Sequence, residues 1–131
     1  MSGFFRGDAS EVYKLAGDLS AVGAKAVPAM RGVMDESGQI LAEQWRSNAE
    51  ATSGEHGVHY PKAITAELAF GVSNIAVDVG PDSSMPQGGM GKGFEYGSRN
   101  QPPHMDGLRA MTWVEPQVVR MTDAAIVYLF P

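Results

Sequence analysis

The chain has 131 residues, a formal charge of −5 and no cysteine. One domain of this size can bury a sizeable core without covalent cross-links. The lack of cysteine excludes disulfides, thiolate metal sites and cysteine nucleophiles. The acidic balance, without a basic cluster, argues against binding duplex nucleic acid by phosphate neutralisation. No run of about 18 apolar residues predicts a transmembrane helix, and the N-terminus lacks the apolar core of a signal peptide, so we expect an intracellular domain.

The first third of the chain predicts two helices. The segment Asp8-Ala9-Ser10-Glu11 has the pattern of a capping box, and apolar residues follow it at helical spacing until Gly23. A second, longer helix should run from Pro28, which suits a first helical turn, to about Ala49. Its apolar stripe comprises Met30, Val33, Met34, Leu41 and Trp45.

Beyond a loop at 51–61, the apolar period changes to two, which indicates strands. Two segments alternate in this way, 63–70 and 74–80, and the short link between them has the length of a hairpin turn. We expect an antiparallel hairpin with one face on the helices. An alternative makes 61–69 the end of a helix, because alanine and glutamate are poor strand formers.

Glycine and proline gather between residues 80 and 107, which predicts a long irregular segment. Within it we expect a protruding glycine-rich loop at 81–93 and a short strand at 94–98. Helical spacing then returns in a short turn at 108–112 and in a helix that begins at Pro116.

The expected fold is α+β in one domain over residues 1–131. Long N-terminal helices pack on a small antiparallel sheet, from which a long glycine-rich loop leads to C-terminal helices. The three parts are a helical region at 1–50, a sheet with its loop at 60–98, and C-terminal helices at 105–131.

No catalytic or metal-binding constellation stands out in the sequence. The glycine run 88–93 lacks the serine or threonine that follows lysine in a phosphate-binding loop. His56 and His59 could be two metal ligands, with Asp78 or Asp82 adding oxygens, but a zinc site needs three or four converging ligands. No Gly-x-Ser-x-Gly nucleophile elbow occurs. We therefore expect no enzyme, no cofactor and no metal.

The end of the glycine-rich loop suggests binding instead. Aromatic residues framed by flexible glycine and rigid proline are typical of segments that anchor on another subunit. The alternative is a corner that packs within the chain. We expect subunit or partner contacts from Gln87, Gly88, Gly91, Phe94, Glu95, Tyr96, Gly97, Pro102, Pro103 and His104.

This region resembles the neck and tail-completion family of long-tailed bacteriophages, which includes head-tail connector and tail-component proteins. It is most similar to the form found in phages of actinobacteria. The resemblance covers about residues 30–130, and Lys92-Gly93 and Gln117 depart from the family pattern. The motifs that carry it are Val79-Gly80-Pro81-Asp82, Gln87-Gly88-Gly89-Met90-Gly91, Phe94-Glu95-Tyr96-Gly97-Ser98, Asn100-Gln101-Pro102-Pro103-His104 and Leu108-Arg109-Ala110.

The resemblance implies a structural virion protein that assembles in the host bacterial cytoplasm. In the family, such a protein forms a ring, most often of six copies, that completes or terminates the tail and joins it to the capsid connector. Its partners would be further copies of itself, the adjacent neck or connector ring and the tail tube protein. Genomic DNA would pass through the lumen without specific binding, as the acidic balance suits, and no membrane would be involved.

Two alternatives stay open. One is a small phage-encoded binding or regulatory module without a virion role. The other is a hydrolase that uses His56 or His59.

Overall fold

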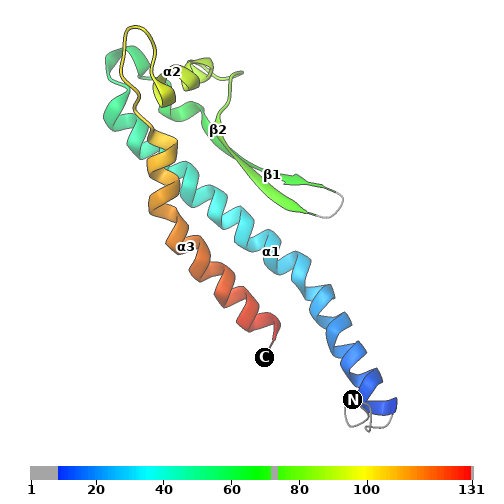
Figure 1. Ribbon diagram of the computed structural model, residues 1–131. Coiled ribbons are helices and arrows are strands. Elements are labelled where there is room, and N and C mark those ends of the chain that lie inside the picture. Colours follow the sequence, from blue (N-terminus) through cyan, green and yellow to red (C-terminus); the bar gives the residue numbers. More distant parts are fainter. Residues whose placement is uncertain (1–8, 72–73, 131) are drawn as a thin grey trace.

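The computed structural model describes residues 9–71 and 74–130. Two long antiparallel helices, α1 (Ala9–Thr52) and α3 (Asp106–Leu129), lie side by side (Figure 1). A hairpin of β1 (Ile64–Phe70) and β2 (Ile75–Pro81) packs on α1. The short helix α2 (Gly91–Tyr96) lies at the end of the molecule where α1 stops and α3 begins. This α+β fold confirms the class expected from the sequence.

The N-terminal region is one helix of 44 residues, so the prediction of two helices is wrong. Gly23 does not end the helix, and Pro28 lies inside it. Residues 24–27 are Ala-Lys-Ala-Val, which favour helix and offer no capping side chain ahead of the proline. An interior proline costs about 3 kcal/mol. Among the side chains of α1 that the structure describes, the buried positions begin after Pro28, at Val33, Ser37 and Gly38. The expected cap at Asp8 lies outside the described residues.

The C-terminal region is also one helix rather than a turn followed by a helix. Pro116 lies inside α3 and does not begin it. The side chains buried in α3 explain this continuity: Ala110 and Val114 precede the proline, and Leu129 follows it. A break at Pro116 would remove one of these groups from the surface of α1.

The predicted hairpin is confirmed, with strand bounds within about a residue of those expected. The register pairs Leu68 with Val77 and Ala66 with Val79, which places these apolar side chains on one face, toward α1. Glu67 pairs with Asp78 on the other face, and both are exposed. The helical alternative for 61–69 is therefore wrong. The expected loop at 51–61 contains the last two residues of α1 and the 3-10 turn Glu55–Gly57, and it ends where a second 3-10 turn, Pro61–Ala63, begins.

The predicted strand at 94–98 is absent: residues up to Tyr96 belong to α2, and Ser98 makes only an isolated bridge to Gln101. The predicted protruding loop at 81–93 is packed instead. A Cβ on Gly88 would overlap the Asp82 carbonyl, and one on Gly91 would lie 2.7 Å from the Cγ of Pro81. The sequence pattern at 94–98 could not distinguish the two structures, because alternation over five residues fits a short strand and a single helical turn equally well.

The core lies between the C-terminal half of α1, the start of the hairpin and α2. Its buried members are Ala42, Ala49, Tyr60, Ile64 and Phe94. Toward its N-terminus α1 extends past the end of α3 (Figure 1). Within the described residues, no helix combines the length and apolar character needed to cross a membrane.

Two glycines of α1 make a matched test of how closely the hairpin approaches. A Cβ on Gly38 would overlap the side chain of Val77, whereas a Cβ on Gly32 meets nothing within 4 Å. Alanine favours helix over glycine by about 1 kcal/mol, so Gly32→Ala should raise the free energy of unfolding by about 0.5–1 kcal/mol. Gly38→Ala should lower it by about 1–2 kcal/mol, because overpacking outweighs that gain. Urea unfolding of both variants checks this, and equal stabilisation by the two would contradict close α1–hairpin packing.

Candidate functional site

The predicted contact residues all lie in the connector, which we define as residues 82–105 between β2 and α3. Gln87 fastens the connector to the turn after α1. Its amide nitrogen donates to the His56 carbonyl oxygen (2.8 Å), and its amide oxygen accepts from the His59 backbone N–H (2.7 Å). His56 and His59, which the metal and hydrolase hypotheses name, thus hydrogen-bond to Gln87 through their backbone atoms. The glycine-rich segment is held against the molecule at this point.

Phe94 and Tyr96 have opposite environments. Phe94 is 3% exposed, and its ring lies 4.5 Å from that of Tyr60 and 5.4 Å from that of His104, measured between centroids. The side chain of Phe94 is thus part of this chain's own core, as the packed-corner alternative had it. Tyr96 is 73% exposed and remains available to a partner.

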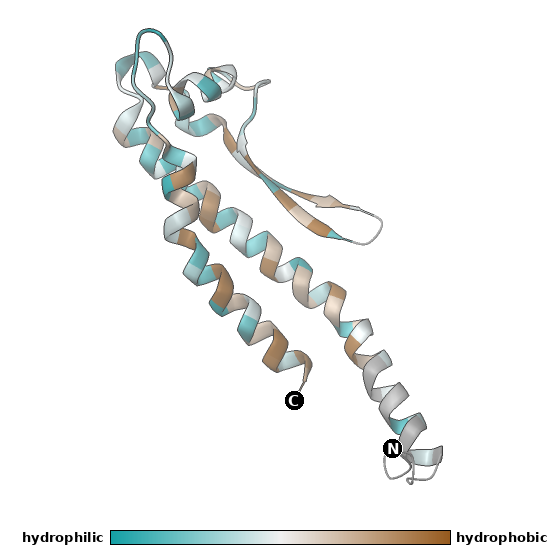
Figure 2. Ribbon diagram, viewed as in Figure 1, coloured by the Kyte–Doolittle hydropathy of each residue, from teal (hydrophilic) through white to brown (hydrophobic). Residues whose placement is uncertain are grey.

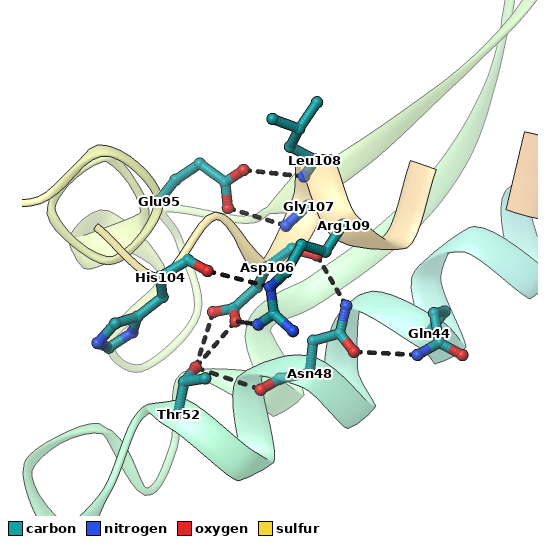
Figure 3. A network of polar contacts seen from close by, with 9 residues as sticks. All are labelled: Gln44, Asn48, Thr52, Glu95, His104, Asp106, Gly107, Leu108 and Arg109. Atoms are coloured by element: carbon teal, nitrogen blue, oxygen red, sulfur yellow. Dashed lines mark hydrogen bonds and ion pairs between the residues drawn. The ribbon is translucent and has the colours of Figure 1, made fainter. Parts of the chain in front are cut away.

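Glu95 caps α3. The residue before the helix, Met105, has φ 53° and provides no side-chain cap. The Glu95 carboxylate instead accepts from the backbone N–H groups of Gly107 (2.9 Å) and Leu108 (3.0 Å) (Figure 3). Negative charge at a helix N-terminus is favourable, and a capping carboxylate is typically worth about 1 kcal/mol. The side chain predicted as a partner contact therefore fixes where α3 begins.

Asp106 is the buried centre of the same network (Figure 3). The hydroxyl of Thr52 lies 2.9 and 3.0 Å from its two carboxylate oxygens, and Arg109 Nη2 lies 2.8 Å from Oδ1. Asn48, held by Gln44, donates to the Asp106 carbonyl oxygen (3.0 Å). A buried charge is tolerated only when it is paired and hydrogen-bonded. These contacts therefore tie the start of α3 to the end of α1.

The remaining predicted residues shape the turn between α2 and α3. Gly97 has φ 86°, and a Cβ there would lie 2.9 Å from the backbone nitrogen of Pro103, so glycine is required. The backbone N–H of His104 donates to the Phe94 carbonyl oxygen (2.8 Å). The two prolines, Pro102 and Pro103, are exposed. Like Tyr96, they are free to contact a partner, whereas His104 and Gly97 hold the connector in place.

The chemistry of this region is that of a joint between elements. Its carboxylates accept from helix N–H groups, a hydroxyl and a guanidinium. A groove of about 600 Å³ lies beside it, lined by Trp45, Lys92 and Tyr96 among others. In the part of the chain that the structure describes, no three His, Asp or Glu side chains are grouped so as to hold a metal ion.

A surface that sequence reasoning missed lies on α3. Apolar side chains that stay about half exposed recur at helical spacing along one face, each between 46% and 60% exposed. We call this face the α3 ridge. Figure 2 shows hydrophobic residues along the whole length of this helix. The α3 ridge consists of Leu108, Met111, Val119 and Ile126, together with Phe130 directly after the helix end.

The signal for the α3 ridge was present in the sequence. On a helical wheel α3 carries a second apolar face in addition to that of Ala110, Val114 and Leu129. The predicted break at Pro116 lies in the middle of this face and divided it into two short pieces, so that the prediction did not show it as one surface.

Removing the buried carboxylate tests the joint. Asp106→Ala leaves Thr52 and Arg109 without their acceptor, and we expect the free energy of unfolding to fall by about 3 kcal/mol. Asp106→Asn should cost less, because it keeps an acceptor oxygen. Asp123→Ala, at an exposed site on the same helix, is the matched control and should change stability by less than about 0.5 kcal/mol. Equal small effects at positions 106 and 123 in chemical denaturation would rule out the joint.

Ionisation of the buried Tyr60 should destabilise the protein at alkaline pH. Burial raises the pKa of the Tyr60 hydroxyl from 10.0 to about 12; the Trp45 indole opposes the rise, and the carboxylates of Asp106 and Glu95 add to it. Above pH 10 the unfolded chain loses a proton that the native state keeps. Stability should therefore be retained below pH 10 and fall by roughly 2–3 kcal/mol as the pH rises to about 12.

The control for this prediction is Tyr60→Phe, which lacks the ionisable group. Since Tyr60→Phe keeps the buried aromatic ring and removes only the hydroxyl, the variant should fold. Urea unfolding across this pH range should show a shallower loss of stability for Tyr60→Phe than for the natural chain. Parallel curves would contradict the assignment.

Comparison of the chain with protein-family models gives no match, and neither do comparisons with curated proteins and with solved structures.

Proposed function

We propose that the chain is a structural subunit of an oligomeric ring at the head-tail junction of a long-tailed phage. The observation that carries the assembly part is the α3 ridge. A helix that is apolar on more than one face is normally buried on more than one face. Here α1 covers one face of α3, and the five side chains of the ridge stay about half exposed.

The size of this surface supports a partner of protein size. Five large apolar side chains at about half exposure present roughly 500 Å². The largest apolar patch on a monomeric protein measures about 300–600 Å² and is often functional. Further exposed apolar residues stand on other sides of the same helix, among them Trp113, Val127 and Tyr128.

The place in the virion is supported by the ordered motifs that resemble the neck and tail-completion family. In this fold, the motif residues Glu95, Gly97 and His104 hold the connector and the start of α3. A motif that builds the joint between the two long helices is consistent with a shared architecture. Tyr96, Pro102 and Pro103 are the exposed members and are our candidates for contacts with an adjacent ring.

In this proposal the protein has no catalytic role and uses no cofactor. Its partners are further copies of the chain, six to a ring as the family resemblance implies, together with the neighbouring connector or neck ring and the tail tube protein. Genomic DNA passes through the lumen without specific contacts.

Native mass spectrometry over a concentration series tests assembly. We expect a discrete closed oligomer, six copies above all, that grows at the expense of monomer as concentration rises. Addition of isolated tails or connectors tests the place in the virion, because the protein should co-sediment with one of them. A variant with Tyr96→Ser should still form the oligomer but bind the adjacent structure more weakly. A chain that stays monomeric and binds neither structure would contradict the proposal.

A further inference from the structure

We propose that the α3 ridge of one copy binds a groove between α1 and the hairpin of the next copy. This inference rests on the assembly part of the proposed function and specifies the surfaces that carry it. The groove has a volume of about 530 Å³. We call it the hairpin groove, and its apolar lining consists of Ala26, Val27, Met30 and Met34 from α1 with Phe70 and Ile75 from the hairpin.

The hairpin groove is an unfilled apolar surface. Val27 is 58% exposed and Phe70 is 56% exposed, so a valine and an aromatic ring stand open at its rim. The volume lies within the range of about 300–1,000 Å³ typical of sites that bind apolar groups. Nothing in the described part of the chain occupies it. A convex row of half-exposed apolar side chains is the complementary shape, and α3 carries such a row.

The charges beside the two surfaces are opposite in sign. The guanidinium of Arg31 lies over the Phe70 ring, 4.8 Å from its centroid, at the edge of the hairpin groove. On α3, helical spacing places Glu115 on the ridge and Asp123 beside it, and both are exposed. Among the described residues the ion pair found is that of Arg109 with Asp106, so Arg31, Glu115 and Asp123 are free to pair between copies.

These matches favour a second copy of the chain as the occupant of the groove. Ridge and groove both expose apolar side chains, and their flanking charges attract. Because ridge and groove are different surfaces, the contact is heterologous. A subunit that offers both can bind a neighbour on each side, and such contacts form a ring when the rotation closes.

The test uses two variants that each break one surface. Ile126→Glu places a charge on the ridge, and Val27→Glu places one in the groove. Both sites are at least 46% exposed in the monomer, so the fold should survive, as circular dichroism will show. Val127→Glu is the matched control, since Val127 is an exposed apolar residue of α3 that lies off the ridge. Self-association should weaken more than tenfold in both test variants and less than threefold in the control.

Mixing the two test variants gives the sharpest result. The ridge variant keeps its groove, and the groove variant keeps its ridge, so the equimolar mixture should form a 1:1 dimer and stop there. Native mass spectrometry with one variant isotopically labelled identifies that dimer. A ridge-to-ridge contact predicts instead that Val27→Glu associates alone, and this outcome would overturn the proposal. Unchanged association of Ile126→Glu would overturn it as well.

A cross-linking measurement covers the case of weak association. The chain has no cysteine, so Ile126→Cys in one copy and Val27→Cys in another can form a disulfide only with each other or with themselves. Mild oxidation of the mixture should give the mixed dimer in preference to either homodimer. A natural chain that stays monomeric, together with no mixed disulfide, would refute the ridge-groove contact.

The outcomes separate this inference from the proposed function. If the ring still forms with both glutamate variants, the ridge-groove contact is wrong but the proposed ring function is not contradicted. A ring that depends on both surfaces yet binds neither tails nor connectors supports the contact and removes the virion role.

Discussion

The position of α3 depends on the carboxylate of Asp106, which is buried where this helix begins. Thr52 and Arg109 surround it with donors, and Asn48 holds the adjacent carbonyl. Because this carboxylate is buried, a displacement of even about an ångström would cost it hydrogen bonds that water cannot replace, so its position is closely defined. Glu95 adds a second constraint on the first N–H groups of the helix. Together these contacts decide the angle and register at which α3 meets α1.

A helix fixed at one end in this way needs only one apolar face for the rest of its contact. Ala110, Val114 and Leu129 provide that face along α1. The hairpin uses another part of α1 and makes little contact with α3. The α3 ridge and the hairpin groove are therefore left apolar and uncovered by the same geometry. Both surfaces stay uncovered because the hairpin and α3 each pack on α1 and, in the described part of the chain, no further layer of structure packs over them.

The motif residues of the connector illustrate how a binding pattern and a structural one coincide. Glycine, proline and aromatic residues mark a flexible segment that reaches a partner, but they equally mark a tight turn that packs on its own core. Phe94 belongs to the second case, since its ring lies between Tyr60 and His104. Tyr96, two residues later, stays exposed because a step of two in a helix turns the side chain well away from the buried face.

The sequence by itself determined the α+β class, the hairpin and the helical character of both ends, because each depends on local periodicity. Only the tertiary structure decided that α1 runs through Pro28 and α3 through Pro116. For Pro116 the reason is packing, because the buried residues on both sides of it outweigh the local cost of proline. The same holds for Asp106, whose partner Thr52 lies 54 residues away. The α3 ridge, too, becomes visible as a surface only once one face of the helix is known to be covered.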